Sequence, residues 1–201
     1  MILIININFI IKFILTMRMR LIIIFVMSEF YQYKKDVLIT DLDQPEKLII
    51  WGAREWLKLI RIAKDPRKSL INGFSQMLVQ ESVVHFDKLM RIIACNAINP
   101  IDIRNQCCLE IGKGEKNILA SITFSQSNFE NYNKKLLSSF IYKHSVYDGC
   151  KCIDEIANSF TRMGYFFQVK NEYLNLAGEN PNNFKNVVFN RFNKNNFMKY
   201  F

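Results

Sequence analysis

A helical pattern in the residues after Asp41 constrains the fold more than any other feature of this chain. Asp43 can cap a first helical turn, Pro45 is tolerated in that turn because its missing N–H would have no partner there, and Glu46 suits the positive end of a helix dipole. Apolar residues then recur at steps of three or four positions, namely Ile49, Ala53, Trp56, Ile60 and Ala63. The pattern predicts an amphipathic helix that ends near Lys64.

Further helices follow from the same spacing and from local start and stop signals. They are expected at about residues 67–78, 83–97, 115–126, 128–142 and 152–163. The chain has only seven Gly and four Pro among 201 residues, and 50% of its residues are hydrophobic, which argues against disorder and against a turn-rich all-β fold. The expected fold is therefore all-α, a single compact bundle of about six helices with irregular termini.

The spacing also predicts which faces of the second and third helices are buried. The expected buried face of the second helix consists of Leu70, Ile71, Phe74, Met77 and Leu78. That of the third helix consists of Val83, Phe86, Leu89, Met90, Ile93 and Ala94. These faces and the stripe of the first helix are expected to meet in one core.

The two ends of the chain differ in composition from its centre. Residues 1–27 are apolar and basic without a single acid, and three cations interrupt them, Lys12, Arg18 and Arg20. No uncharged run there is long enough to span a bilayer, so this leader is interpreted as a membrane-associating segment, a mis-assigned translation start or a helix packed on the domain. Residues 28–40 are expected to be a linker, 41–164 the helical domain, and 165–201 a weakly structured tail rich in Asn, Phe and Lys.

Four short features mark the central part of the chain. They are Trp51-x-x-Arg54-Glu55-Trp56, Asp65-Pro66, a cysteine pair after Asn99-Pro100, and the Gly114-Glu115 opening of a helix. In these features the chain resembles small helical bacterial proteins that have no assigned activity. The resemblance implies a helical fold and transfers no functional residue.

The five cysteines allow a metal site but do not favour one. Four of them, Cys107, Cys108, Cys150 and Cys152, could supply thiolates to zinc, but an adjacent pair and a C-x-C pair lack the C-x2-C spacing of known zinc sites. The alternative is small, reduced, apolar residues near helix ends, with Cys95 as the fifth thiol. A reduced set indicates a cytoplasmic protein, with membrane association through residues 1–27 as the alternative.

No catalytic or cofactor-binding motif is recognisable in the sequence. The two histidines, His85 and His144, lie outside nucleophile and metal motifs, and His85 is expected to be structural. The sequence Gly112-Lys113-Gly114-Glu115-Lys116 superficially resembles a phosphate loop, but it lacks the Walker spacing and a preceding strand. It is predicted to be a helix-entry turn. Neither an enzymatic activity nor a cofactor is expected.

A basic ridge is predicted on the first two helices. It consists of Arg54, Lys58, Arg61, Lys64, Arg67 and Lys68. The formal net charge is +9, of which the leader supplies three, leaving +6 for residues 28–201. Such a ridge could follow a phosphate backbone, and a solvated outer face explains it equally well.

The preferred interpretation is a non-enzymatic module for protein–protein interaction or a structural module. Trp51 lies at the boundary of the first helix's apolar stripe, where it could anchor a partner protein or a second copy, or could cover the rim of the core. The predicted interaction residues are Trp51, Arg54, Lys58 and Arg61. A basic nucleic-acid-binding domain is the first alternative, and a zinc protein using the cysteine pairs is the second.

Overall fold

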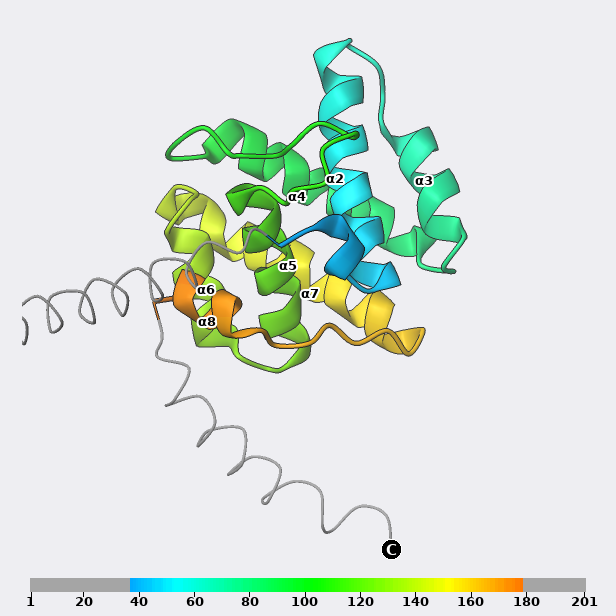
Figure 1. The fold of residues 1–201 in the computed structure, drawn as a ribbon. Helices are drawn as coiled ribbons and strands as arrows, with labels where there is room; N and C mark the ends of the chain where they lie inside the picture. Colours follow the sequence, from blue (N-terminus) through cyan, green and yellow to red (C-terminus); the bar gives the residue numbers. More distant parts are fainter. Residues whose placement is uncertain (1–36, 179–201) are drawn as a thin grey trace, which may run out of the picture. The chain divides into compact units, whose positions relative to one another are not determined.

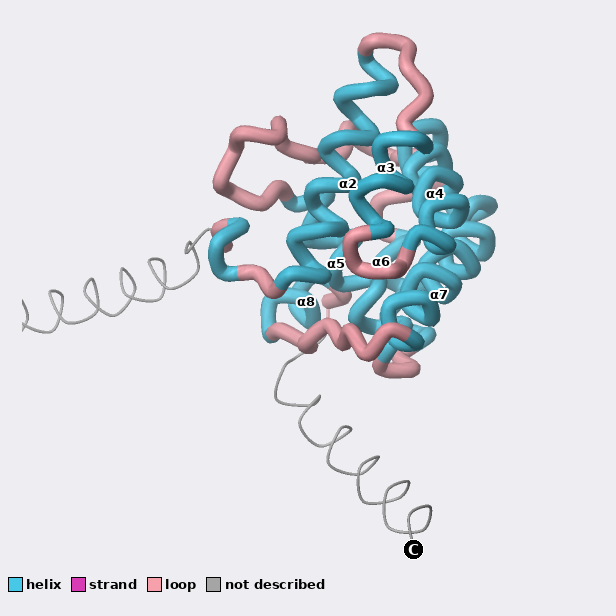
Figure 2. Tube along the Cα trace, turned by 90° about the vertical axis from the view of Figure 1, so that its right-hand side faces the viewer, coloured by secondary structure: helices cyan, strands magenta, loops and turns pink. Residues whose placement is uncertain are grey.

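The computed structural model describes residues 37–178 as a bundle of α-helices (Figure 1). Seven α-helices occur in this range: α2 (Gln44–Arg61), α3 (Arg67–Ser75), α4 (Val83–Asn96), α5 (Lys113–Gln126), α6 (Glu130–Ser138), α7 (Val146–Arg162) and α8 (Asn171–Leu176). Figure 2 contains no strand within the described range, where only two isolated β-bridges occur. The all-α prediction is confirmed. The predictions for the leader 1–27 and for the end of the tail lie outside the described residues.

Helix α2 begins as its sequence predicts and ends slightly earlier. The Asp43 N–H donates to the Glu46 carboxylate over 3.1 Å, and Pro45 lies in the first turn. The apolar stripe is buried only as far as Trp56, because the last turn projects beyond the neighbouring helices (Figure 1). Ile60 is 37% exposed, and Ala63 adopts a left-handed conformation with φ of 54° that terminates the helix.

Helix α5 is the central element of the bundle. It packs against α2, α6, α7 and α8, and from Gly114 to Phe124 only Lys116 is not buried. Three aromatic rings link α3, α4 and α7, because the centre of the Phe74 ring lies 5.2 Å from that of Phe86 and 6.4 Å from that of Phe160. Each burial of this kind contributes roughly 1.5–3 kcal/mol to the free energy of unfolding. The aromatic side chains thus join α3 and α4 to α7, which in turn packs against α5.

Some boundaries and faces differ from the predictions. Helix α7 starts at Val146 rather than near Cys152, because a short 3-10 turn leads directly into it. Ile71, Leu78 and Ala94 were predicted to be buried and are exposed. For Leu78 the reason is that α3 already ends at Ser75, after which Leu78 takes a positive φ of 59° and leaves the helical face.

The helical domain also extends beyond the predicted boundary at residue 164. Phe167, Tyr173 and Leu174 are buried, and Lys170 Nζ lies 2.8 Å from the Glu46 carboxylate at the start of α2. Helix α8 has only six residues, too short for a readable period, so the pattern gave no signal for it. The tail was predicted to begin at residue 165, but residues 165–178 belong to the folded domain.

Candidate functional site

The side chain of Arg54 lies inside the protein rather than on the predicted ridge. Its Nε and Nη2 atoms donate to the two carboxylate oxygens of Glu115 over 2.6 and 2.9 Å, and both side chains are at most 1% exposed. The pair joins the middle of α2 to the first turn of α5. This fork-to-fork geometry is the strongest form of an arginine–carboxylate contact. Arg54 is therefore a structural residue, and its prediction as an exposed interaction residue is wrong.

The remaining donors of Arg54 hold the connection between α4 and α5. Its Nη1 atom donates to the carbonyls of Asn105 and Cys108 over 3.1 and 2.5 Å, and Nη2 donates to the carbonyl of Glu110 over 2.7 Å. The five N–H donors of the guanidinium group are thus all used. One side chain fixes the backbone of this long connection at three points.

The turn into α5 is shaped by the close approach of two backbone segments. A Cβ atom on Gly112 would lie 2.3 Å from the carbonyl oxygen of Asp102, and one on Gly114 would lie 2.2 Å from Ile101 Cγ2. The N–H groups of Gly112 and Lys113 donate to the carboxylates of Glu115 and Asp102. The protein's own carboxylates therefore occupy this helix N-terminus, which supports the prediction of a helix-entry turn.

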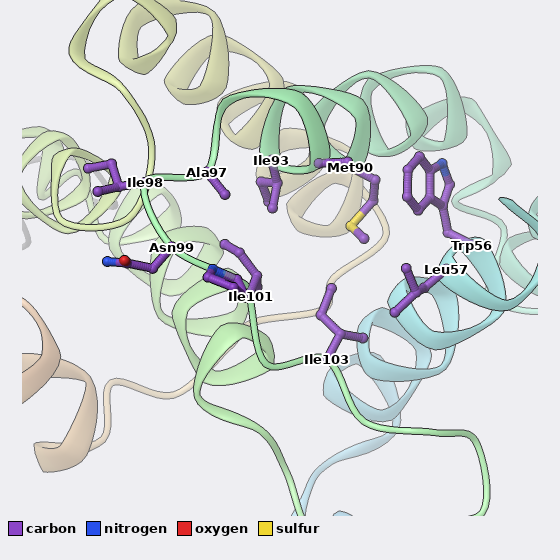
Figure 3. A pocket seen from close by; sticks show the side chains of 11 residues that line it. Trp56, Leu57, Met90, Ile93, Ala97, Ile98, Asn99, Ile101 and Ile103 are labelled. Carbon is purple, nitrogen blue, oxygen red and sulfur yellow. The ribbon is translucent and has the colours of Figure 1, made fainter. Parts of the chain in front are cut away.

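An apolar groove of about 410 Å³ lies between α2, α4 and residues 97–103. Figure 3 shows Met90 and Ile93 pointing from α4 toward Ile101 and Ile103, with Trp56 at one end. Trp56, Met90 and Ile93 are at most 3% exposed, whereas the rim residue Ile98 is 43% exposed. The indole N–H of Trp56 donates to Asp87 over 2.7 Å, so the only polar atom of that ring is already bonded.

A basic recess of about 290 Å³ adjoins this apolar groove. It is lined by Arg54, Leu57, Lys58, Arg61, Ile62, Arg104, Asn105 and Gln106. Leu57 lines both cavities, and the chain passes from the groove at Ile103 to the recess at Arg104. Lys58 and Arg61 are exposed as predicted, and they belong to one recess that Arg104 completes.

Ion pairs with neighbouring acids partly compensate the cations of the recess. Lys58 Nζ lies 3.3 Å from Glu55, and Arg104 Nε lies 3.1 Å from Asp102. Arg61 has no carboxylate partner among residues 37–178. Because Glu115 neutralises Arg54, Arg61 supplies the uncompensated positive charge of the recess.

Trp51 lies against α3 and lines neither cavity. The glycine at position 73 makes room for its ring, since a Cβ atom there would lie 2.2 Å from Trp51 Cζ3. The side chain is half-buried, in agreement with its predicted place at the edge of the core. Its role as an anchor for a partner stays a prediction.

The four cysteines considered for zinc do not come together. Cys107 is exposed in the connection before α5, while Cys150 and Cys152 are buried in α7, where burial raises the pKa of the Cys150 thiol to about 11. Among residues 37–178 no group of three His, Cys, Asp or Glu side chains is arranged to hold a metal ion. The metal set is therefore not supported by its geometry.

The residues missed by sequence reasoning lie mainly in the connection between α4 and α5. Ile98, Ile101 and Ile103 recur there within a segment that follows no helical period, and these aliphatic residues were the available signal.

Comparison with protein-family models, curated proteins and solved structures finds no match for this chain, so the resemblance to small bacterial proteins gains no support. No helix within the described range combines the length and apolar character that crossing a membrane would require.

Proposed function

We propose that this protein is a non-enzymatic binding module that holds a segment of a partner protein in the apolar groove. The observation that carries the proposal is the groove itself, in which an apolar floor and an exposed aliphatic rim lie beside a basic recess. The flexible side chain of Met90, which lies among aliphatic side chains in the groove, can adapt to a partner's apolar residues. Such a surface favours protein binding over chemistry on a substrate.

The bonding of three of the four buried acids in the described range also supports a binding role. Glu46 accepts hydrogen bonds from Lys170 and Tyr173, Asp87 accepts one from Trp56, and Glu115 holds Arg54. Each of these carboxylates connects elements of the fold and lies outside the lining of the groove. A cytoplasmic location accords with this proposal, because all five cysteines are free thiols.

Site-specific photo-cross-linking in cells that produce the full chain tests the proposed function. A benzoylphenylalanine at Ile98, on the groove rim, should give a discrete cross-linked product, whereas one at Tyr147, which is 75% exposed on α7, should not. A product of twice the chain's mass would identify a second copy as the partner. Equal labelling from both positions, or none from Ile98, would contradict a binding role for the groove.

Nucleic-acid binding is the second candidate function, favoured by the exposed cations at the end of α2 and the start of α3. Lys58, Arg61, Lys64 and Lys68 remain exposed, but Arg54 no longer contributes to the ridge. Binding of this kind should weaken steeply as salt increases and should disappear when Lys58 and Arg61 are reversed to Glu. A mobility shift that is absent or insensitive to salt would remove this candidate.

A further inference from the structure

We infer that the basic recess binds a carboxylate of the same partner segment whose apolar residues enter the groove. This inference rests on the proposed function and specifies the chemistry of the partner: an acidic residue beside apolar anchors. It assigns the cations around Arg61 a recognition role that is separate from the structural role of Arg54.

The first argument is that the two cavities are adjacent. Leu57 lies between them and lines both, and the consecutive residues Ile103 and Arg104 line the groove and the recess respectively. Adjacent side chains of one short segment can therefore reach both places. An apolar site with a few placed polar groups is the usual form of a specific binding site.

The second argument is electrostatic. Lys58 and Arg61 come from α2 and Arg104 comes from the connection, and the residues that line the recess include no carboxylate. The pair of Arg104 with Asp102 lies at the surface, with 44% and 41% of the two side chains exposed, whereas Lys58, itself 55% exposed, pairs with the largely buried Glu55. An exposed pair such as that of Arg104 is weak, so Arg104 can exchange Asp102 for a ligand's carboxylate. Arg61 is already available, because no acid among residues 37–178 pairs with it.

The third argument is that one wall of the recess is fixed before any ligand binds. Arg54 holds the carbonyls of Asn105 and Cys108, which keeps this part of the connection in place. The backbone N–H groups of Asn105 and Gln106 make no hydrogen bond to the described part of the chain, so they remain able to donate. A wall that is held in place before binding lowers the entropic cost of binding a ligand there, because less of the site has to be ordered.

Peptide selection on the full chain tests the inference. A random 12-residue peptide library displayed on phage is panned on the unmodified protein, on Arg61→Glu and on the control Lys151→Glu. Lys151 is exposed on α7 and lines neither cavity, so it matches the charge change without touching the recess. We expect the unmodified protein and the control to enrich Asp or Glu next to apolar residues.

The expected effect of Arg61→Glu is the loss of acid enrichment while apolar enrichment persists. A selected acidic peptide should bind the Arg61→Glu variant about tenfold more weakly, with a smaller loss for Arg61→Gln, because charge complementarity at a rim tunes affinity modestly. The Arg61→Gln variant avoids placing an acid at the C-terminal end of α2, and its unfolding curve shows whether the fold is intact.

Other outcomes separate this inference from the proposed function. Enrichment of apolar peptides without acids, unchanged by Arg61→Glu, would overturn the inference and leave the proposed function standing. Failure to enrich any peptide would overturn both. If sodium dodecanoate instead changed the tryptophan emission of the unmodified protein but not of Arg61→Glu, the occupant would be a small amphiphile rather than a protein segment.

Discussion

Arg54 and Arg61 lie two turns apart on α2 and have opposite surroundings. The side chain of Arg54 is 1% exposed, and its donors hold Glu115 and three backbone carbonyls. Arg61 is exposed at the last turn and has no acidic partner among residues 37–178. The same residue type on one helix is therefore structural where other elements surround it and available for binding where the helix projects beyond them.

The largest expected effect is on stability and follows from substituting the buried arginine, Arg54. Arg54→Met should lower the free energy of unfolding by about 3–5 kcal/mol, because it leaves Glu115 buried without a cationic partner. Arg61→Met should change it by less than about 0.5 kcal/mol, as exposed substitutions usually do. Urea unfolding of both variants measures the difference, and equal losses would contradict the contrast between the two arginines.

A paired substitution sharpens the same point. Arg54→Met combined with Glu115→Leu removes both buried charges and should recover part of the loss caused by Arg54→Met alone. Recovery remains partial because the carbonyls of Asn105, Cys108 and Glu110 lose their donors. If the double variant were less stable than the additive expectation, the charge of Glu115 would not be the source of the loss.

The next effect concerns the connection that Arg54 holds. Gly114→Ala should cost about 1–3 kcal/mol, because the added Cβ would meet Ile101 and the carbonyl of Asp102 at distances well below contact. Gly149→Ala in α7 is the matched control, since its nearest neighbour, Ile141 Cδ1, lies at 3.3 Å at the end of a flexible side chain. The midpoint of thermal unfolding should be lower for Gly114→Ala than for Gly149→Ala. Similar midpoints would argue against a tight turn at Gly114.

A smaller effect is expected at the second buried carboxylate, Glu46. Tyr173→Phe removes the hydroxyl that donates to Glu46 over 3.3 Å and should cost about 1 kcal/mol. Burial, and secondly the Glu46 carboxylate, raises the pKa of Tyr173. The protonated Tyr173 hydroxyl therefore makes its full contribution to the free energy of unfolding below the ordinary tyrosine pKa of about 10. This contribution is lost as the pH rises above that value, because Tyr173 then ionises only in the unfolded chain.

Stability measured between pH 8 and 11 checks the role of Tyr173. The unmodified protein should lose more stability over this range than Tyr173→Phe does. Parallel curves for the two proteins would show that the hydroxyl is not protected from ionisation in the folded state.

The smallest expected effect lies at the exposed end of α2. Ala63→Gly should stabilise the protein by about 0.5 kcal/mol, because glycine adopts the φ of 54° there without the strain of a Cβ atom. This net value allows for the higher conformational entropy that glycine gives the unfolded chain. The control Ala94→Gly, at an exposed position within α4, should instead cost about 0.5–1 kcal/mol. A loss at both positions would mean that the left-handed turn at Ala63 carries no strain.

Local patterns determined much of the architecture. The start of α2, the existence of α3, α4 and α5, and the helix-entry turn at Gly112 all follow from capping residues and from apolar spacing, which act within a few positions along the chain. The helical class follows from the low content of glycine and proline. Lys58 and Arg61 were also identified correctly as exposed cations.

Tertiary contacts decided which charged side chains are buried and where the candidate site lies. Arg54 and Glu115 are 61 positions apart, and Glu46 and Lys170 are 124 apart, so no local period could show that either pair is buried. The connection between α4 and α5, which lines the groove and the recess, is held against α2 by the hydrogen bonds of Arg54 to the carbonyls of Asn105, Cys108 and Glu110. Spacing along the chain fixes which way a side chain leaves its helix, but only the packing of distant elements determines whether it meets a partner, the core or water.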